Sequence, residues 1–174
     1  MGPDLSGAGA ERGGQPQPVL RSVLDRLVDD EPDRTVDPPV NRTQLLREHR
    51  ESVLRDLGNL LNTRRASGEI PAALEDLVPS LADYGLRDFV ADGLATAQSR
   101  ADLRKSIERA ILLYEPRFKR VDVRVFQTSP EDGDPALRVR IDALLHAEPA
   151  PISVAFDTVI DPVSGSFGTG GTAR

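Results

Sequence analysis

Residues 99–125 read SRADLRKSIERAILLYEPRFKRVDVRV, and this stretch predicts the helix-to-strand transition around which the chain is organised. Apolar residues in its first half recur at helical spacing and share one face: Leu103, Ile107, Ala110, Ile111 and Tyr114. Ser99 is expected to cap this helix, with Asp102 where a capping-box acid would stand. Pro116 is expected to end it, because proline lacks an amide hydrogen and disfavours helical geometry in the preceding residue, Glu115.

Beyond Phe118 the apolar period changes from helical to two, which indicates a strand. The alternation places three residues on one side and two on the other: Val121, Val123 and Val125 against Asp122 and Arg124. The sequence Glu115-Pro116-Arg117 therefore lies at a corner between a helix and a strand. A rigid proline holds two opposite charges near each other there.

Three short motifs, taken in order, resemble those of the phage baseplate wedge/sheath-initiator family. They are VLRDLGNLLNTRR at 53–65, YGLRDF at 84–89, and YEPRF at 114–118 followed by a Val-x-Val strand. That family includes the TssE subunit of bacterial type VI secretion baseplates. The resemblance extends over roughly residues 19–167.

Composition excludes several kinds of site. The chain has 174 residues, enough for one domain with a moderate core. It has no cysteine, so it has neither a disulfide framework nor a thiolate ligand, and its two histidines, His49 and His146, are far apart. We therefore expect no metal and no cofactor. The net charge of −6 argues against a general nucleic-acid surface.

Neither a signal-peptide pattern nor an apolar run long enough for a membrane span is present. We expect a cytoplasmic protein that does not insert into a membrane. Four segments are predicted: a disordered 1–17, a short amphipathic helix with an acidic, proline-rich linker over 18–40, a single domain over 41–162, and a flexible tail over 163–174. The short helix either packs on the core or docks on a partner, and the sequence leaves both open.

The domain is predicted to begin with helices. Asn41, with Gln44 three residues later, is expected to cap a helix that ends near Asn62. Its apolar stripe is Leu46, Val53, Leu57, Leu60 and Leu61, and its opposite face, expected to be mostly solvated, carries Arg47, Glu48, Glu51, Arg55 and Asp56. A short helix over 71–81, a turn at Tyr84-Gly85 and a helix over 86–97 should follow.

Three strand-like runs follow the corner, at 120–127, 137–145 and 152–158. They predict an antiparallel meander with one face covered by helices and the other partly wet. The fold class is therefore α+β, with N-terminal helices packed on a small C-terminal antiparallel sheet.

Two pairs of charged residues are open to two interpretations each. Arg64 and Arg65 either complement the dipole at the end of their helix or form a basic patch for an acidic partner surface. Glu115 is expected to satisfy backbone amides or Arg117, which would leave the guanidinium with spare donors for a partner. Whether this corner is purely internal or also touches a neighbouring subunit stays open.

The resemblance implies a structural subunit of a contractile injection machine, most similar to type VI secretion, that links the baseplate to the first sheath ring. The implied partners are other baseplate wedge subunits and contractile sheath subunits. We expect strand addition at an exposed edge to template the sheath. The motif residues that the resemblance marks as structural or partner-binding are Arg64, Arg65, Tyr84, Gly85, Glu115, Pro116 and Arg117, and the strand-edge candidates are Arg138, Arg140, Ile152, Val154 and Phe156. Arg138 and Arg140 either set partner register or lie on a solvated face.

Two other functional classes are weighed against assembly. Some members of the family have carried a lysozyme-like label, which makes Glu115 a candidate general acid. A glycosidase needs a pair of carboxylates and a sugar cleft, but this chain has no tryptophan. An ion pair with Arg117 would also oppose the raised pKa that a general acid requires. We expect no enzyme activity; the third class is a small adaptor domain.

Overall fold

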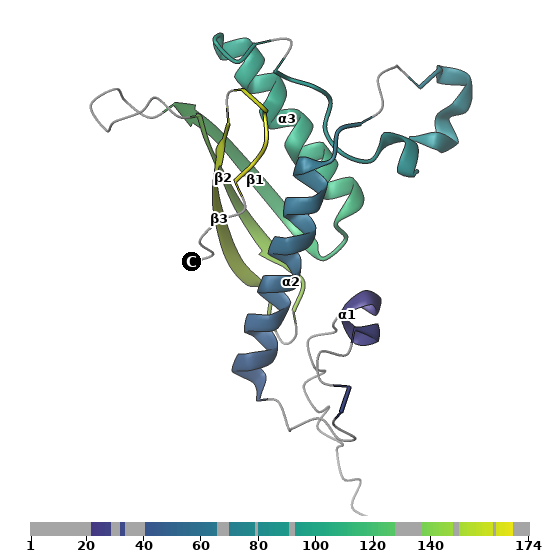
Figure 1. The fold of residues 1–174 in the computed structure, drawn as a ribbon, viewed down its shortest axis with the longest axis vertical. Coiled ribbons are helices and arrows are strands. Elements are labelled where there is room, and N and C mark those ends of the chain that lie inside the picture. The colour runs from purple at the N-terminus through teal and green to yellow at the C-terminus, as the bar shows by residue number, and fades with distance from the viewer. Residues whose placement is uncertain are drawn as a thin grey trace, which may run out of the picture.

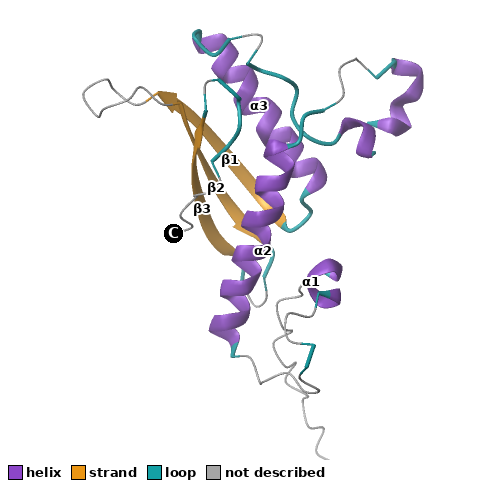
Figure 2. Cartoon of the chain, viewed as in Figure 1, coloured by secondary structure: helices purple, strands orange, loops and turns teal. Residues whose placement is uncertain are grey.

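The computed structural model describes residues 22–28, 32–33, 41–65, 70–78, 80–90, 93–127, 137–147, 150–161 and 163–168. Helices come first in the chain and a three-stranded antiparallel sheet comes last (Figures 1 and 2). The predicted α+β class is confirmed. The expected disordered segment 1–17, most of the acidic linker and the polar turn at 128–135 lie outside the described residues.

Helix α2, Arg42–Asn62, begins where the sequence predicts. The Oδ1 atom of Asn41 accepts a hydrogen bond from the backbone amide of Gln44 at 2.8 Å, which satisfies one of the free amides of the first turn. Four of the five predicted stripe residues are buried: Val53, Leu57, Leu60 and Leu61. Leu46 is half-buried.

Helix α3, Ala97–Tyr114, begins earlier than predicted because Thr96, not Ser99, is its cap. The hydroxyl of Thr96 accepts the backbone amide of Ser99 at 3.0 Å. Asp102 accepts hydrogen bonds from the side chain of Gln98 instead of completing a capping box. The helix ends directly before the Glu-Pro-Arg corner, as Pro116 requires.

Three strands follow in the order β1-β2-β3: β1 Phe118–Gln127, β2 Leu137–Leu145 and β3 Ile152–Ile160. Their register places Val123 opposite Ile141 and Ile141 opposite Phe156. The inward residues alternate with outward ones, and those that are buried are Phe118, Val123, Val139, Ile141, Ala143, Leu145, Val154, Phe156 and Ile160. Both the meander and its alternation are confirmed.

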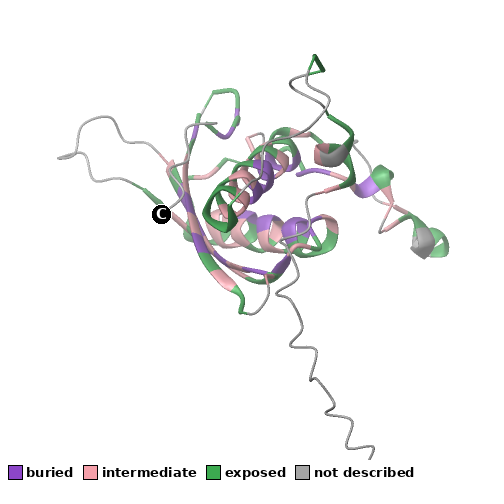
Figure 3. Cartoon of the chain, turned by 90° about the horizontal axis from the view of Figure 1, so that it is seen from below, coloured by how far each residue is buried: buried purple, intermediate pink, exposed green. Residues whose placement is uncertain are grey.

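Helices α2 and α3 lie on one face of the sheet, and the buried residues gather between these layers (Figures 1 and 3). Ile107 of α3 and Val53 of α2 are completely shielded from solvent. Burying an aliphatic side chain of this size contributes roughly 1.5–3 kcal/mol. Phe118 packs edge-to-face on Phe156, with ring centroids 6.3 Å apart, so the corner end of β1 is part of the same core.

Of the two helices predicted between α2 and α3, the short one over 71–81 is present in 3-10 form, and the prediction of the one over 86–97 is wrong. The short 3-10 helices are η1 Ala72–Leu77 and η2 Leu81–Asp83, and the backbone at Leu74 is non-helical. Residues 86–90 and 93–96 form no helix. Leu86 instead makes a parallel bridge with Arg64, and its amide donates to the carbonyl of Thr63 at 2.9 Å. Leu86 and Phe89 of this segment are nevertheless buried.

The two ends of the described chain behave differently. Helix α1, Val23–Leu27, leaves Val23, Leu24 and Leu27 mainly exposed, so its apolar side does not pack on the core. Residues 163–168, part of the expected tail, fold back so that Phe167 is only 4% exposed and packs edge-to-face on Phe89. None of the helices in the described ranges is both long and apolar enough to cross a membrane.

Candidate functional site

At the Glu-Pro-Arg corner, the side chains of Glu115 and Arg117 form an ion pair within the chain. Glu115, 7% exposed, ends α3, and Arg117 begins the turn into β1. The Nε atom of Arg117 donates to Oε1 of Glu115 at 2.6 Å, and Nη2 donates to Oε2. Pro116 between them fixes the backbone so that the two side chains meet in this bidentate geometry.

The guanidinium of Arg117 is also bonded to α2. Its Nη2 donates to Oδ2 of Asp56 at 2.6 Å, and its Nη1 donates to the hydroxyl of Ser52 at 3.1 Å. Four of the five N–H donors of the guanidinium are thus used within the chain, and the second N–H of Nη1 is the one that these bonds leave over. The hydrogen bond to Glu115 raises the pKa of Arg117 further, although burial opposes the charge.

The same network continues to α1. The carboxylate of Asp25 accepts from Ser52 and from Arg55, each at 2.6 Å, and from Ser22. Burial raises the pKa of Asp25, but the hydrogen bonds from Ser22, Ser52 and Arg55 outweigh it and leave the pKa well below its usual value. This network of polar contacts thus ties α1, α2 and the corner together.

The sequence interpretation missed part of this network. Arg55 and Asp56 were expected on a solvated helix face, but they bridge α2 to α1 and to the corner. One signal was available, since Ser52 and Asp56 are four residues apart and so share a helix face. Nothing local to α2 indicates that this face meets Arg117, sixty-one residues beyond Asp56.

His49 lies beside this network and is 4% exposed. Neither of its ring nitrogens has a hydrogen-bond partner among the described residues. Burial lowers the pKa of His49, and the positive charge of Arg117 lowers it further, while Glu115 and Asp25 act in the opposite direction. His49 is therefore held as a neutral ring against a charged cluster.

Arg64 and Arg65 follow α2 and both are paired within the chain. Arg64 bonds the carbonyl of Ser164 and pairs with Asp88 at 3.4 Å. Arg65 pairs with the buried carboxylate of Asp83. The predicted role of Arg64 and Arg65 toward a partner depends on their positive charge. These internal pairs partly neutralise that charge.

Gly85, in the predicted turn after Tyr84, is required by close packing. Its φ of +99° is a conformation that side-chain-bearing residues rarely adopt. A Cβ atom at this position would lie 2.3 Å from the carbonyl oxygen of Thr63. Tyr84 itself packs edge-to-face on Tyr114, with centroids 5.1 Å apart, so the turn joins the end of α2 to the end of α3.

The strand-edge prediction is half wrong. Strand β2 is central and pairs along its whole length with β1 and β3, so residues 137–145 offer no free edge. Arg138 and Arg140 lie instead on the outer face of the sheet, where Arg140 pairs with Asp142 at 3.1 Å and with Asp157 at 3.5 Å. Strand order depends on long-range pairing, which the alternation of residues does not encode.

Strand β3 is an edge strand whose outer backbone groups are only partly used. The carbonyl of Val159 accepts from the amide of Gly168 at 2.9 Å, on the side away from β2. Backbone groups alternate sides along an antiparallel strand, so Ser153, Ala155 and Asp157 also point outward. No backbone group among the described residues pairs with these three. The predicted candidates Ile152, Val154 and Phe156 point their side chains toward the core from the same strand.

An apolar groove of about 410 Å³ runs between α2 and β3. Its walls include Leu54, Leu57, Gly58, Leu61, Phe156 and Phe167. A Cβ atom built on Gly58 would have no neighbour within 4 Å, so this position of the helix is open toward the groove. The opposite edge of the sheet is different, because the carboxylate of Glu108 accepts the outward amide of Val123 at 3.2 Å.

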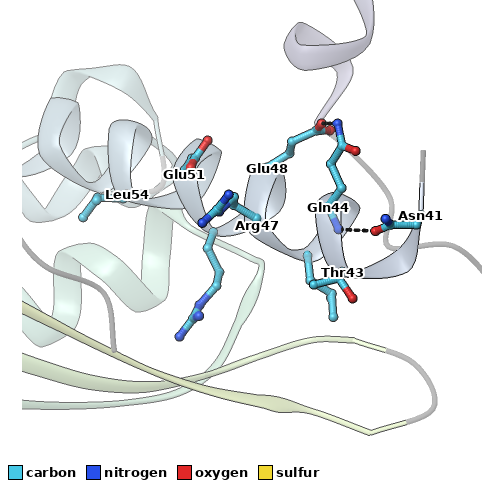
Figure 4. Close-up of a pocket in the computed structure, with 9 residues that line it drawn as sticks. Asn41, Thr43, Gln44, Arg47, Glu48, Glu51 and Leu54 are labelled. Atoms are coloured by element: carbon cyan, nitrogen blue, oxygen red, sulfur yellow. Dashed lines mark hydrogen bonds between the residues drawn. The ribbon is translucent and has the colours of Figure 1, made fainter. Parts of the chain in front are cut away.

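The site lacks the arrangement that a glycosidase needs. Both oxygens of Glu115 accept from Arg117, and Asp56, the neighbouring carboxylate, binds the same guanidinium. A hollow of about 950 Å³ lies elsewhere, along the first half of α2, and its lining includes Arg47, Glu48 and Glu51 (Figure 4). Within the described ranges, no three acidic or histidine side chains are grouped to hold a metal ion.

Comparison with known families agrees with the motifs in the sequence. The family model described as baseplate wedge protein gp25 matches residues 47–150. These residues include most of α2, all of α3, the Glu-Pro-Arg corner, β1 and β2, whereas α1 and β3 lie outside them. Comparisons with curated proteins and with solved structures gave no match. Since the matched residues are more than half of the chain, the chain belongs to the family of the baseplate wedge protein gp25.

Proposed function

We propose that this baseplate subunit links the wedge to the first sheath ring and templates sheath assembly by accepting a strand at the outer edge of β3. The observation that carries the proposal is the outward backbone of Ser153, Ala155 and Asp157, which no described residue pairs, beside the α2–β3 groove. An added strand would lie about 4.8 Å from β3. Its inward side chains would then reach the groove, while its backbone would continue the ladder.

The corner supports this role by fixing the wall of the groove. Arg117 joins the start of β1 to Asp56 and Ser52 on α2, so the helix is held at a set position over the sheet. We propose that the corner acts mainly within the subunit. Any contact that it makes with a neighbouring wedge subunit would use the exposed ring of Pro116 and the remaining surface of Arg117.

Within the family, we propose that the chain is a TssE-like subunit of a type VI secretion baseplate and works in the cytoplasm. The order of the three motifs supports this assignment. The proposed partners are the other wedge subunits and the contractile sheath subunits of the same apparatus. A structural role also predicts no turnover of peptidoglycan by the purified protein.

The strand-addition proposal is tested by removing one outward amide. Ala155→Pro abolishes the N–H of an edge residue without removing a bond to β2. We expect the variant to keep its circular dichroism spectrum and to lose co-purification with sheath subunits. Val125→Pro on the opposite edge is the matched control and should retain the sheath.

Two results would contradict this mechanism. Retention of the sheath by a folded Ala155→Pro variant would exclude the β3 edge, and loss in Val125→Pro alone would assign the other edge. If the wild type bound wedge subunits but no sheath subunit, strand addition would be wrong and the baseplate role would stand. Binding to neither group would favour the adaptor class.

A further inference from the structure

A basic hollow of about 530 Å³ lies between α3 and the loop that precedes it. Four cationic side chains line it: Arg65, Arg87, Lys105 and Arg109. Its other lining includes the carboxylates Asp88 and Asp102, the hydroxyls of Ser99 and Ser106, and apolar groups of Phe89, Leu94 and Leu103. It shares no lining residue with the α2–β3 groove.

The carboxylates do not neutralise these cations. The buried carboxylate of Asp83 accepts from both Arg65 and Arg109, so one negative charge serves two guanidiniums. Asp88 pairs with Arg64, which lies outside the lining. Five cations thus meet three carboxylates once Asp102 is counted, which leaves a local positive excess on a chain whose net charge is −6.

Two of the cations have no partner within the described residues. Arg87 and Lys105 are exposed, and no ion pair or hydrogen bond joins either side chain to that part of the chain. This distinguishes them from Arg65 and Arg109, which Asp83 holds in place. Their N–H groups are therefore available to an external acceptor.

We propose that the basic hollow binds an acidic segment of a partner protein, with Arg87 and Lys105 as the contacting cations. A short acidic segment senses mainly charges within about one Debye length, roughly 8–10 Å. A long polyanion such as nucleic acid also senses the negative charge of the whole chain. The apolar base formed by Phe89 and Leu103 further suits a peptide with apolar residues between its carboxylates. The inference does not depend on strand addition at β3.

The probe is a fluorescein-labelled decapeptide of alternating Glu and Leu, titrated with the full chain at low ionic strength and followed by fluorescence anisotropy. The Gln-Leu peptide tests whether the carboxylates are recognised. Arg87→Glu/Lys105→Glu is the test variant. Lys119→Glu/Arg120→Glu is the matched control, because these exposed residues at the start of β1 give the same change in net charge.

We expect the test variant to raise the Kd of the Glu peptide about tenfold or more, and the control to raise it by about twofold or less. The Gln peptide should bind the wild type weakly. If the Glu variant does not fold, Arg87→Gln/Lys105→Gln takes its place in the same titration. The folding of each variant is checked by circular dichroism.

Three results would overturn the proposal. They are absence of binding of the Glu peptide to the wild type, equal weakening in the test and control variants, and tighter binding of a single-stranded oligonucleotide that the test variant also loses. The last result would assign the hollow to nucleic acid instead.

Discussion

Arg117 donates two hydrogen bonds to the carboxylate of Glu115 across the proline that separates them, with Nε 2.6 Å from Oε1. The pair is shielded, since the side chain of Glu115 is 8% exposed and that of Arg117 is 18% exposed. A charge in such a place is stable only while its partner is present. The corner therefore makes the fold sensitive to single substitutions.

Arg117→Ala should lower the free energy of unfolding by about 3 kcal/mol, because it leaves Glu115 buried without its counter-charge and removes the bond to Asp56. Urea denaturation followed by circular dichroism measures the change. Arg124→Ala, on the exposed outer face of the sheet, is the control and should cost less than about 1 kcal/mol. Equal losses in the two variants would mean that the corner contributes no more than a surface pair.

Gly85→Ala should destabilise the fold by about 3 kcal/mol or more, because positive φ and a clash with the Thr63 carbonyl act together. Gly58→Ala offers a contrast, since it lies within α2 with free space around its Cβ. That change should stabilise the protein by roughly 0.5–1 kcal/mol. Thermal unfolding of both glycine variants tests these two expectations. A wild-type Tm for Gly85→Ala would refute the packing argument.

The stability of the protein should fall with acidification as His49 becomes charged. Its pKa in the folded state is lowered from 6.5, so the folded state favours the neutral ring and its contribution is complete above that value. As the pH falls below 6.5, the unfolded chain takes up the proton first, with a limiting slope of about 1.4 kcal/mol per pH unit. Denaturation at several pH values should show this slope in the wild type and a smaller slope in His49→Leu. The same slope in both proteins would assign the effect to another group.

Asp25→Asn should release α1 while leaving the core folded, because that carboxylate makes the hydrogen bonds that join α1 to Ser52 and Arg55. Limited proteolysis should cut the variant faster near α1. Its circular dichroism spectrum should stay close to that of the wild type. Ser22→Ala removes a contact within α1 only and serves as the control. Unchanged proteolysis in Asp25→Asn would show that other contacts hold α1.

Gly58→Phe should block the α2–β3 groove without disturbing the core, since the new ring would project into open space. Under strand addition, this variant loses sheath subunits but keeps other wedge subunits in co-purification. Gly58→Ala adds too little volume to fill the groove and should bind both. If the Gly58→Phe variant still binds the sheath, sheath binding does not use the α2–β3 groove.

The sequence alone determined the elements whose signals are local. The change of period after Phe118, the proline at 116 and the Asn41 cap predict α2, the end of α3 and three alternating strands, and the structure has them. The motifs also predicted the family that the comparison then showed. These features depend on residues that are neighbours in the chain. Local hydrogen bonds and the regular direction of successive side chains are enough to produce them.

Tertiary structure decided the features that depend on distant residues. It made β2 the central strand, which removed Arg138 and Arg140 from the edge, and it gave Arg117 the partners Asp56 and Ser52 on α2. It also drew Leu86 into a bridge with Arg64 instead of a helix. Strand order and buried ion pairs are fixed by contacts between segments far apart in the chain, and a periodic pattern carries no information about which segments meet.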